Sequence, residues 1–135
     1  MRLKFRGAVL AACGLLAVAV PVFAHHSFAA EFQTDKELTV TGTMTKVEWT
    51  NPHIYFYVDS KGDDGKITTW AFEGLPPGML HRAGLTREMF KVGEAITVTG
   101  VPCKDGTKHM GYGKSFKYNS DGHQITMWVT DREQP

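Results

Sequence analysis

The chain has 135 residues, of which 42% are hydrophobic and 21% charged, and its formal net charge is +1 at pH 7. A chain of this length and composition is expected to form one small domain around its own core rather than a disordered segment. It lacks the basic surplus of a nucleic-acid-binding protein, so nucleic acid is excluded as an expected partner.

Residues 1–24 have the three parts of a secretory signal peptide. Three basic residues precede an apolar stretch at 8–20, and Val22-Phe23-Ala24 matches a small-x-small cleavage site. The apolar stretch is shorter than the roughly 20 residues of a membrane span, so we expect no membrane attachment after cleavage. The cut would leave 111 residues with 12 basic and 14 acidic side chains. The sequence therefore predicts a periplasmic or secreted protein cut after Ala24.

The predicted cut would make His25 the first residue, followed directly by His26. A terminal α-amine and the imidazole of the same residue form a chelate for a transition metal, and nitrogen ligands suit Cu(II). His53 would supply a further nitrogen, whereas a thioether such as that of Met110 would favour Cu(I). We therefore predict copper ligands among His25, His26 and His53. The alternative is that His25 and His26 belong to a solvated, flexible N-terminal segment that binds no metal.

Residues 25–36 form a predicted arm, in which Phe28 and Phe32 would hold the N-terminus against the domain. Six strands follow, each indicated by alternating apolar residues and bounded by turn residues. Their expected ranges are Glu37–Thr50, Ile54–Asp59, Ile67–Glu73, Glu94–Pro102, Gly111–Tyr118 and Gln124–Val129. In the first strand the apolar phase slips after Met44, which indicates a β-bulge near Thr45.

A helical insert interrupts the strands. Pro76-Pro77 begins a predicted short helix that ends at Gly84, and Thr86 is a candidate cap for a further turn. Asp-Gly pairs at 64–65, 105–106 and 121–122 predict tight turns elsewhere.

Three strands, a helix and two more strands are the order of an OB-type barrel. We therefore predict an all-β fold: a five-stranded OB-like barrel whose end is plugged by the helical insert, plus a C-terminal hairpin strand. A β-sandwich is the alternative. The domain would occupy residues 37–130, with a tail at 131–135.

OB folds bind ligands on their second and third strands, between the first and fourth inter-strand loops of the barrel. His53 lies in the first of these loops, and His109 and Met110 lie in the other. The barrel prediction thus expects imidazoles on both loops of one rim.

The second and third strands also carry a candidate ligand face. Tyr55, Tyr57 and Trp70, with Glu73 at a strand end, would contact a small ligand or a partner protein. The alternative is that these aromatic residues fill the core or cover the sheet. The chain has no nucleophile elbow, zinc-protease helix or phosphate-binding glycine loop, so no enzyme activity is predicted. Cys103 is predicted to be a buried small hydrophobe.

Two motifs carry a resemblance to a known family. Ala24-His25-His26-Ser27-Phe28 and Val47-Glu48-Trp49-Thr50-Asn51-Pro52-His53 resemble a family of short exported bacterial proteins of unknown function, known by its His-His-Ser-Phe and Asn-Pro-His motifs. The resemblance extends through Trp70, Glu73 and Lys104-Asp105-Gly106 and becomes loose near residue 108, and Cys103 departs from it. It implies export, a small all-β domain and family-type positions at His25, His26 and His53, without implying an activity.

Overall fold

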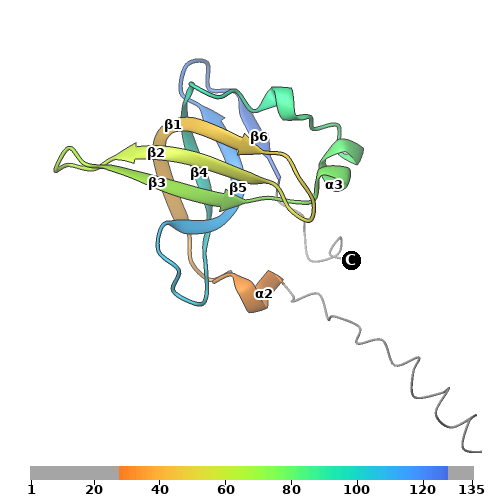
Figure 1. Ribbon diagram of the computed structural model, residues 1–135, viewed down its shortest axis with the longest axis horizontal. Coiled ribbons are helices and arrows are strands. Elements are labelled where there is room, and N and C mark those ends of the chain that lie inside the picture. Colours follow the sequence, from red (N-terminus) through yellow and green to blue (C-terminus); the bar gives the residue numbers. More distant parts are fainter. Residues whose placement is uncertain (1–27, 128–135) are drawn as a thin grey trace, which may run out of the picture.

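The computed structural model describes residues 28–127. The strands are β1 (Leu38–Glu48), β2 (Tyr55–Lys61), β3 (Ile67–Glu73), β4 (Ala95–Pro102), β5 (Met110–Tyr118) and β6 (Gln124–Thr126), and the helical segments are α2 (Phe28–Glu31), α3 (Pro77–Arg82) and η1 (Arg87–Met89) (Figure 1). Outside the described residues lie the predicted signal peptide at residues 1–24, His25, His26 and the predicted tail. Between residues 28 and 127, no helix has the length and apolar character needed to cross a bilayer.

The first five strands close into a barrel. Neighbouring strands follow the order β3-β2-β1-β4-β5-β6, and β3 also pairs with β5. This additional pairing is parallel and joins residues 71–73 to residues 110–112. It closes the barrel, while β6 is bonded to β5 on the outside. The predicted OB-like barrel with an added C-terminal strand is confirmed, and the chain does not adopt the alternative sandwich.

A bend in β1 makes this closure possible. Residues 38–43 pair with β4, whereas residues 43–48 pair with β2. The register against β2 slips between Met44 and Lys46, which confirms the bulge predicted near Thr45. A Cβ atom on Gly42 would overlap the backbone carbonyl of Asp59, so only glycine lets β2 approach this closely.

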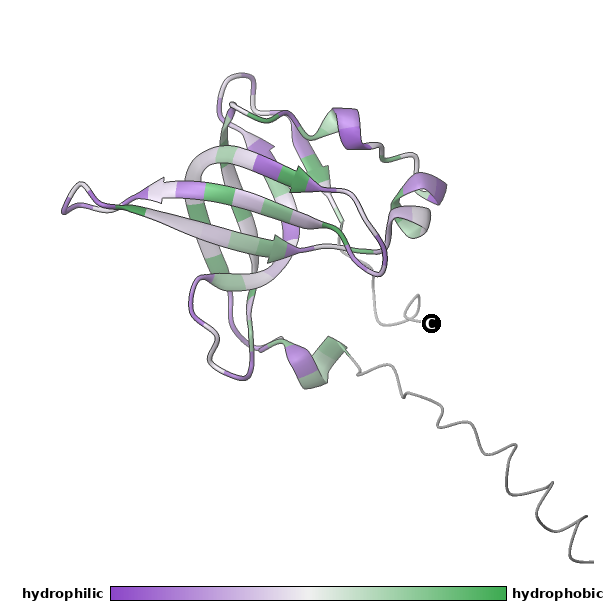
Figure 2. Ribbon diagram, viewed as in Figure 1, coloured by the Kyte–Doolittle hydropathy of each residue, from purple (hydrophilic) through white to green (hydrophobic). Residues whose placement is uncertain are grey.

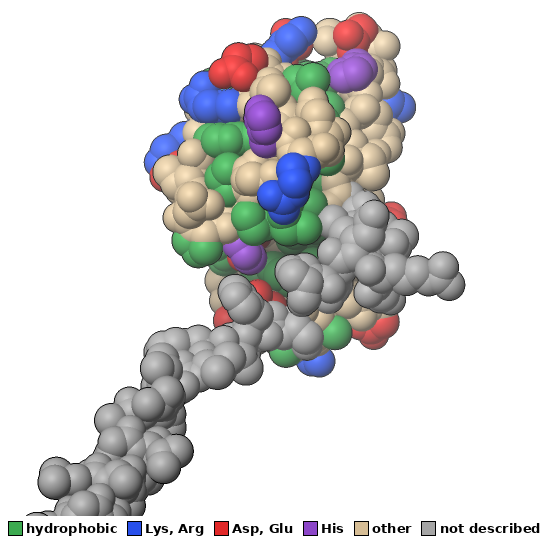
Figure 3. Space-filling view, turned by 90° about the vertical axis from the view of Figure 1, so that its right-hand side faces the viewer, with side chains coloured by type: hydrophobic (Ala, Val, Ile, Leu, Met, Phe, Trp, Pro, Cys, Tyr) green, Lys and Arg blue, Asp and Glu red, His purple; other side chains and the backbone are tan. Residues whose placement is uncertain are grey.

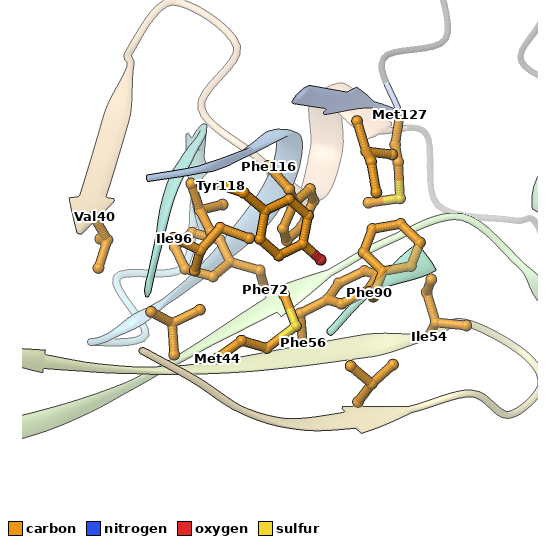
Figure 4. Close-up of a cluster of buried hydrophobic side chains, with 14 of the residues drawn as sticks. Val40, Met44, Ile54, Phe56, Phe72, Phe90, Ile96, Phe116, Tyr118 and Met127 are labelled. Atoms are coloured by element: carbon orange, nitrogen blue, oxygen red, sulfur yellow. The ribbon is translucent and has the colours of Figure 1, made fainter. Parts of the chain in front are cut away.

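Large apolar side chains fill the interior of the barrel. Phe56, Phe72 and Phe116 point inward from three strands and have no exposed surface (Figure 4). The rings of Phe56 and Phe116 lie 4.5 Å apart, and the ring of Phe90 lies 4.6 Å from that of Phe56. Phe90 comes from the segment between η1 and β4, so the insert between β3 and β4 contributes a side chain to the core.

The insert and the turns follow their sequence signals. α3 begins directly after Pro76, and Gly84 follows it with a φ of 78°. Thr86 is the N-cap residue of η1, as predicted, but its side chain makes no capping hydrogen bond. Gly65, in the Asp-Gly turn between β2 and β3, has a φ of 79°, which glycine adopts without strain. The turns are mostly hydrophilic, whereas the strands alternate in hydropathy (Figure 2).

Candidate functional site

The loop between β1 and β2 presents His53 to the end of β3. The Asn51-Pro52 peptide bond in this loop is cis. The Nδ1 atom of His53 is hydrogen-bonded to the Oε1 atom of Glu73, the last residue of β3. The imidazole side chain is 39% exposed, whereas the carboxylate side chain is only 10% exposed. The imidazole of His53 is therefore at the surface and is hydrogen-bonded to a buried carboxylate.

Glu73 is the one buried charged residue within the described part of the chain. Burying a carboxylate is costly unless hydrogen bonds compensate for lost water. Its second oxygen, Oε2, accepts a hydrogen bond of 3.1 Å from the hydroxyl of Tyr55. Burial, together with the negative charge of Glu73, raises the pKa of Tyr55 to about 12, so this hydroxyl stays protonated at neutral pH. Both oxygens of Glu73 thus have donors.

The hydrogen bond to Glu73 determines which ring nitrogen of His53 carries the proton. A carboxylate that accepts a hydrogen bond from Nδ1–H places the proton of the neutral ring on Nδ1, so Nε2 carries the lone pair. In metal-binding histidines, the ring nitrogen that does not bind the metal commonly donates a hydrogen bond to such a carboxylate. This bond orients the ring and makes the other nitrogen a better ligand. The pair of Glu73 and His53 is suited to bind a metal through Nε2.

The N-terminal arm is attached next to this pair. The ring of Phe28, the first described residue, lies 4.9 Å edge-on from the ring of Tyr112. Tyr112 pairs with Glu73 in the parallel register of β3 and β5. Glu31 in α2 lies close enough for its charge to contribute to the raised pKa of Tyr55. The described chain therefore begins near Glu73 and, through it, near His53.

Backbone contacts hold the arm in this position. Phe32 is 4% exposed and forms an isolated bridge with Cys103. The backbone N–H of Lys104 donates to the carbonyl of Glu31 over 2.8 Å, and the amide side chain of Gln33 donates to the carbonyl of Cys103 over 2.9 Å. The expectation that Phe28 and Phe32 hold the arm against the domain is confirmed.

A family model described as a family of unknown function (DUF6152) matches residues 11–112, well over half of the chain. The chain belongs to this family. No curated protein and no solved structure matches it. Membership agrees with the resemblance to a family of unknown function, and export stays a prediction. The range matched by the family model contains His25, His26 and His53 and ends in β5.

In this family member, the structure brings together only part of the predicted site. His25 and His26 lie outside the described residues. His53, Tyr55 and Glu73 form one hydrogen-bonded group. On the face seen in Figure 3, histidine side chains are scattered rather than gathered. Between residues 28 and 127, no group of three or more His, Cys, Asp or Glu side chains is placed to hold a metal ion.

The predicted ligand face is divided between the two sides of the sheet. Tyr55 pairs with Glu73 and Tyr57 with Ala71, so these residues share the outer face. Tyr57, however, donates its hydroxyl to Glu48 over 2.9 Å. Trp70 pairs with the fully buried Val58 and therefore points to the opposite side.

The imidazoles of His53 and His109, which lie on two different loops of the barrel, do not face one another. The ring of His109 stands edge-on to that of Trp70 at 5.1 Å, whereas His53 is bound to Glu73. Trp70 and Glu73 are three positions apart on one strand and so face opposite sides. Met110 packs instead against the cluster of Phe32, Val101, Cys103 and Tyr112 under the arm.

Cys103 is buried, as predicted. Burial raises the pKa of its thiol, and the charges of Asp105, Glu73 and Glu31 add to this effect. Because the thiolate is the reactive form, Cys103 should be a poor nucleophile in the folded protein. We expect alkylation by iodoacetamide at pH 8 to be at least about tenfold slower in the native protein than in guanidinium. Equal rates in the two conditions would show that the thiol is accessible.

Proposed function

We propose that the protein is exported, is cut after Ala24, and binds a copper ion between its new N-terminus and His53. The α-amine and imidazole of His25 would supply two nitrogens, and Nε2 of His53 would supply a third. A set of nitrogen ligands suits Cu(II). The leader supports the location, because residues 1–24 have the basic, apolar and small-residue segments of a signal peptide.

One observation carries the proposal: His53 is held by a buried carboxylate beside the place where the described chain begins. His25 stands three residues before Phe28, and three residues of extended chain span about 10 Å. Phe28 packs on Tyr112, which is in register with Glu73, and Glu73 holds His53. The proposal requires residues 25–27 to bring the terminal amine to the exposed imidazole of His53.

The protonation of the amine does not oppose binding at neutral pH. A terminal amine has a pKa of about 7.7–8.0, so its deprotonation at pH 7 costs about 1 kcal/mol. Chelation by three nitrogens would exceed this cost. The imidazole of His53 needs no proton removed from Nε2 if Glu73 keeps the proton on Nδ1.

The experiment compares copper affinity in matched histidine variants. The protein is exported with its own leader, its start at His25 is verified by intact mass, and Cu(II) is titrated against a competing chelator. We expect His53→Gln, which keeps an N–H donor for Glu73, to weaken Cu(II) binding by more than about tenfold. His81→Gln is the control, because His81 is an exposed histidine on α3.

Three outcomes decide the proposal. A loss in both His25→Ala and His53→Gln but not in His81→Gln, with thermal unfolding unchanged, supports the site. A loss confined to His26→Gln would place the metal within the arm and contradict the role of His53. Unchanged affinity in His25→Ala and in His53→Gln would contradict the copper site and favour a binding module that uses the aromatic face.

A further inference from the structure

We propose that the free edge of β3 at Ile67 is a self-association surface, where two copies of this chain pair their β3 strands in antiparallel orientation. Ile67 of one copy lies opposite Ile67 of the other. This surface belongs to the hairpin of β2 and β3, and its pairing is independent of the copper site.

The β2–β3 hairpin projects from the barrel on the side away from α3 (Figure 1). Asp59 is the last residue of β2 that pairs with β1, and β5 pairs only with residues 71–73 of β3. Beyond these contacts the hairpin is a ribbon of two strands. A two-stranded ribbon is at best marginally stable in water, and three or more strands are needed for independent stability. A further strand would therefore stabilise the projecting hairpin.

The backbone of β3 has unpaired groups along this edge. The N–H of Gly62 donates to the carbonyl of Lys66 over 2.8 Å, so Lys66 turns its backbone toward β2. Residues of an antiparallel strand alternate in this respect, so Ile67 and Thr69 turn their N–H and C=O groups away from β2. Within residues 28–127, no strand pairs with that side of Ile67 and Thr69. The edge is therefore open to a strand from another molecule.

The open edge is short and is centred on Ile67. At one end, the N–H of Ala71 donates to the carbonyl of His109 over 2.9 Å, so β5 occupies the edge from there on. At the other end, the chain turns away at Gly65. Residues 65–69 are thus available to a new strand, and Ile67 is the middle one. Antiparallel pairing about a two-fold axis at this residue lets the two copies of Ile67 exchange two backbone hydrogen bonds.

The side chains along the edge favour this pairing. Ile67 is 67% exposed, more than any other large hydrophobic residue in the described part of the chain. A single exposed isoleucine is common on protein surfaces, so its side chain alone would not indicate a contact. Residues 67–70, however, are β-branched or aromatic and include no charge or proline, the residues that usually protect free edges. In the pair, each Ile67 side chain would cover the other.

The charges at the two ends of the open edge are complementary. The turn between β2 and β3 carries Asp63 and Asp64, and the loop before β5 carries Lys108. Asp64 is paired with Lys66 over 3.4 Å, which leaves the charge of Asp63. Antiparallel pairing brings the turn of each copy next to the loop of the other, so this attraction occurs twice. The complementarity favours a second copy over an unrelated strand.

The association should be weak. Two segments of five residues bury far less than the roughly 1,200 Å² at which stable interfaces begin. We therefore expect a dissociation constant between about 10 μM and about 1 mM. Dilute protein is then a monomer, and substitutions of the exposed Ile67 should not alter its unfolding.

Sedimentation velocity of the exported protein, with a chelator present so that copper plays no part, measures the association. We expect the sedimentation coefficient to rise from that of a monomer to that of a dimer as the concentration approaches about 1 mM. Ile67→Lys, which places a charge on the edge, should weaken the association by at least about tenfold. Val92→Lys is the matched control, because Val92 is a 52% exposed hydrophobic residue outside the hairpin, and it should leave the association unchanged.

Cysteine cross-linking tests the register. Opposed residues of a hydrogen-bonded pair have Cα atoms about 5.5 Å apart, within the range of a disulfide. Ile67→Cys should therefore form a disulfide-linked dimer with oxidised glutathione. Lys61→Cys is the control, because Lys61 is the neighbour of Ile67 in β2, and its two copies would be three strand spacings, about 14 Å, apart. Cys103 is buried and common to both variants.

Association that Ile67→Lys weakens and Val92→Lys does not, together with cross-linking of Ile67→Cys alone, supports the surface. A monomer at about 1 mM would overturn the inference. Association that Ile67→Lys leaves unchanged, or equal cross-linking of Ile67→Cys and Lys61→Cys, would overturn it as well.

Discussion

Retaining Val22-Phe23-Ala24 ahead of His25 is expected to abolish tight copper binding while leaving the barrel folded. The additional residues turn the amine of His25 into a peptide nitrogen, so the chelate of amine and imidazole is lost. Three residues are retained because Ala24 alone would place His25 and His26 second and third from the amine, an arrangement of nitrogens that itself binds Cu(II) tightly. Removing outer-shell groups commonly costs about 10- to 100-fold in metal affinity, and loss of a direct ligand should exceed about 100-fold. Competition titration of Cu(II) against protein of verified N-terminal mass measures this loss.

The matched control carries three additional residues at the C-terminus, after Pro135, and should bind copper as the wild type does. Thermal unfolding of both proteins without metal should agree, because the arm contacts begin at Phe28 and Phe32. If the protein that retains Val22-Phe23-Ala24 binds Cu(II) as tightly as mature protein, the terminal chelate plays no part.

Phe56→Ala is expected to lower the free energy of unfolding by about 3–5 kcal/mol, the range for removing a large buried aromatic side chain. Phe56 has no exposed surface and contacts Phe90 and Phe116 at ring-centroid distances of 4.6 and 4.5 Å. It therefore joins β2 and β5 to the segment between η1 and β4. Urea unfolding, followed by tryptophan fluorescence, measures the change.

Ile67→Ala provides the comparison. Ile67 is a large hydrophobic residue that is 67% exposed at the start of β3. Its replacement should change the free energy of unfolding by no more than about 0.5 kcal/mol. A loss of less than about 1 kcal/mol in Phe56→Ala would contradict a core centred on these rings.

Local patterns in the sequence predicted most of the fold. Alternation of apolar residues located the strands, and the slip of phase after Met44 located the bulge that β1 needs to pair with both β2 and β4. The parallel contact of β3 with β5 followed only from the order of elements, because its residues are far apart in sequence and carry no local signal. The exact strand ends also differed, since pairing partners decide where a strand stops.

The candidate site was predicted less completely. His53 and Glu73 were both identified, yet as a metal ligand and as part of a ligand face rather than as a bonded pair. A signal existed: a hairpin turning at Asp64-Gly65 places Tyr55 opposite Glu73, and His53 is two residues before Tyr55. The same register also places Tyr55 and Trp70 on opposite faces of the sheet. The burial of Glu73 depends on the contact with β5 and the arm, which no local pattern predicts.

The most direct test of the central claim is a pulsed EPR spectrum of the exported, mature protein loaded with Cu(II). The account predicts nitrogen couplings from coordinated imidazoles, with a component that disappears in His53→Gln and persists in His81→Gln. A spectrum that is the same in wild type and His53→Gln would contradict a copper site between the N-terminus and His53.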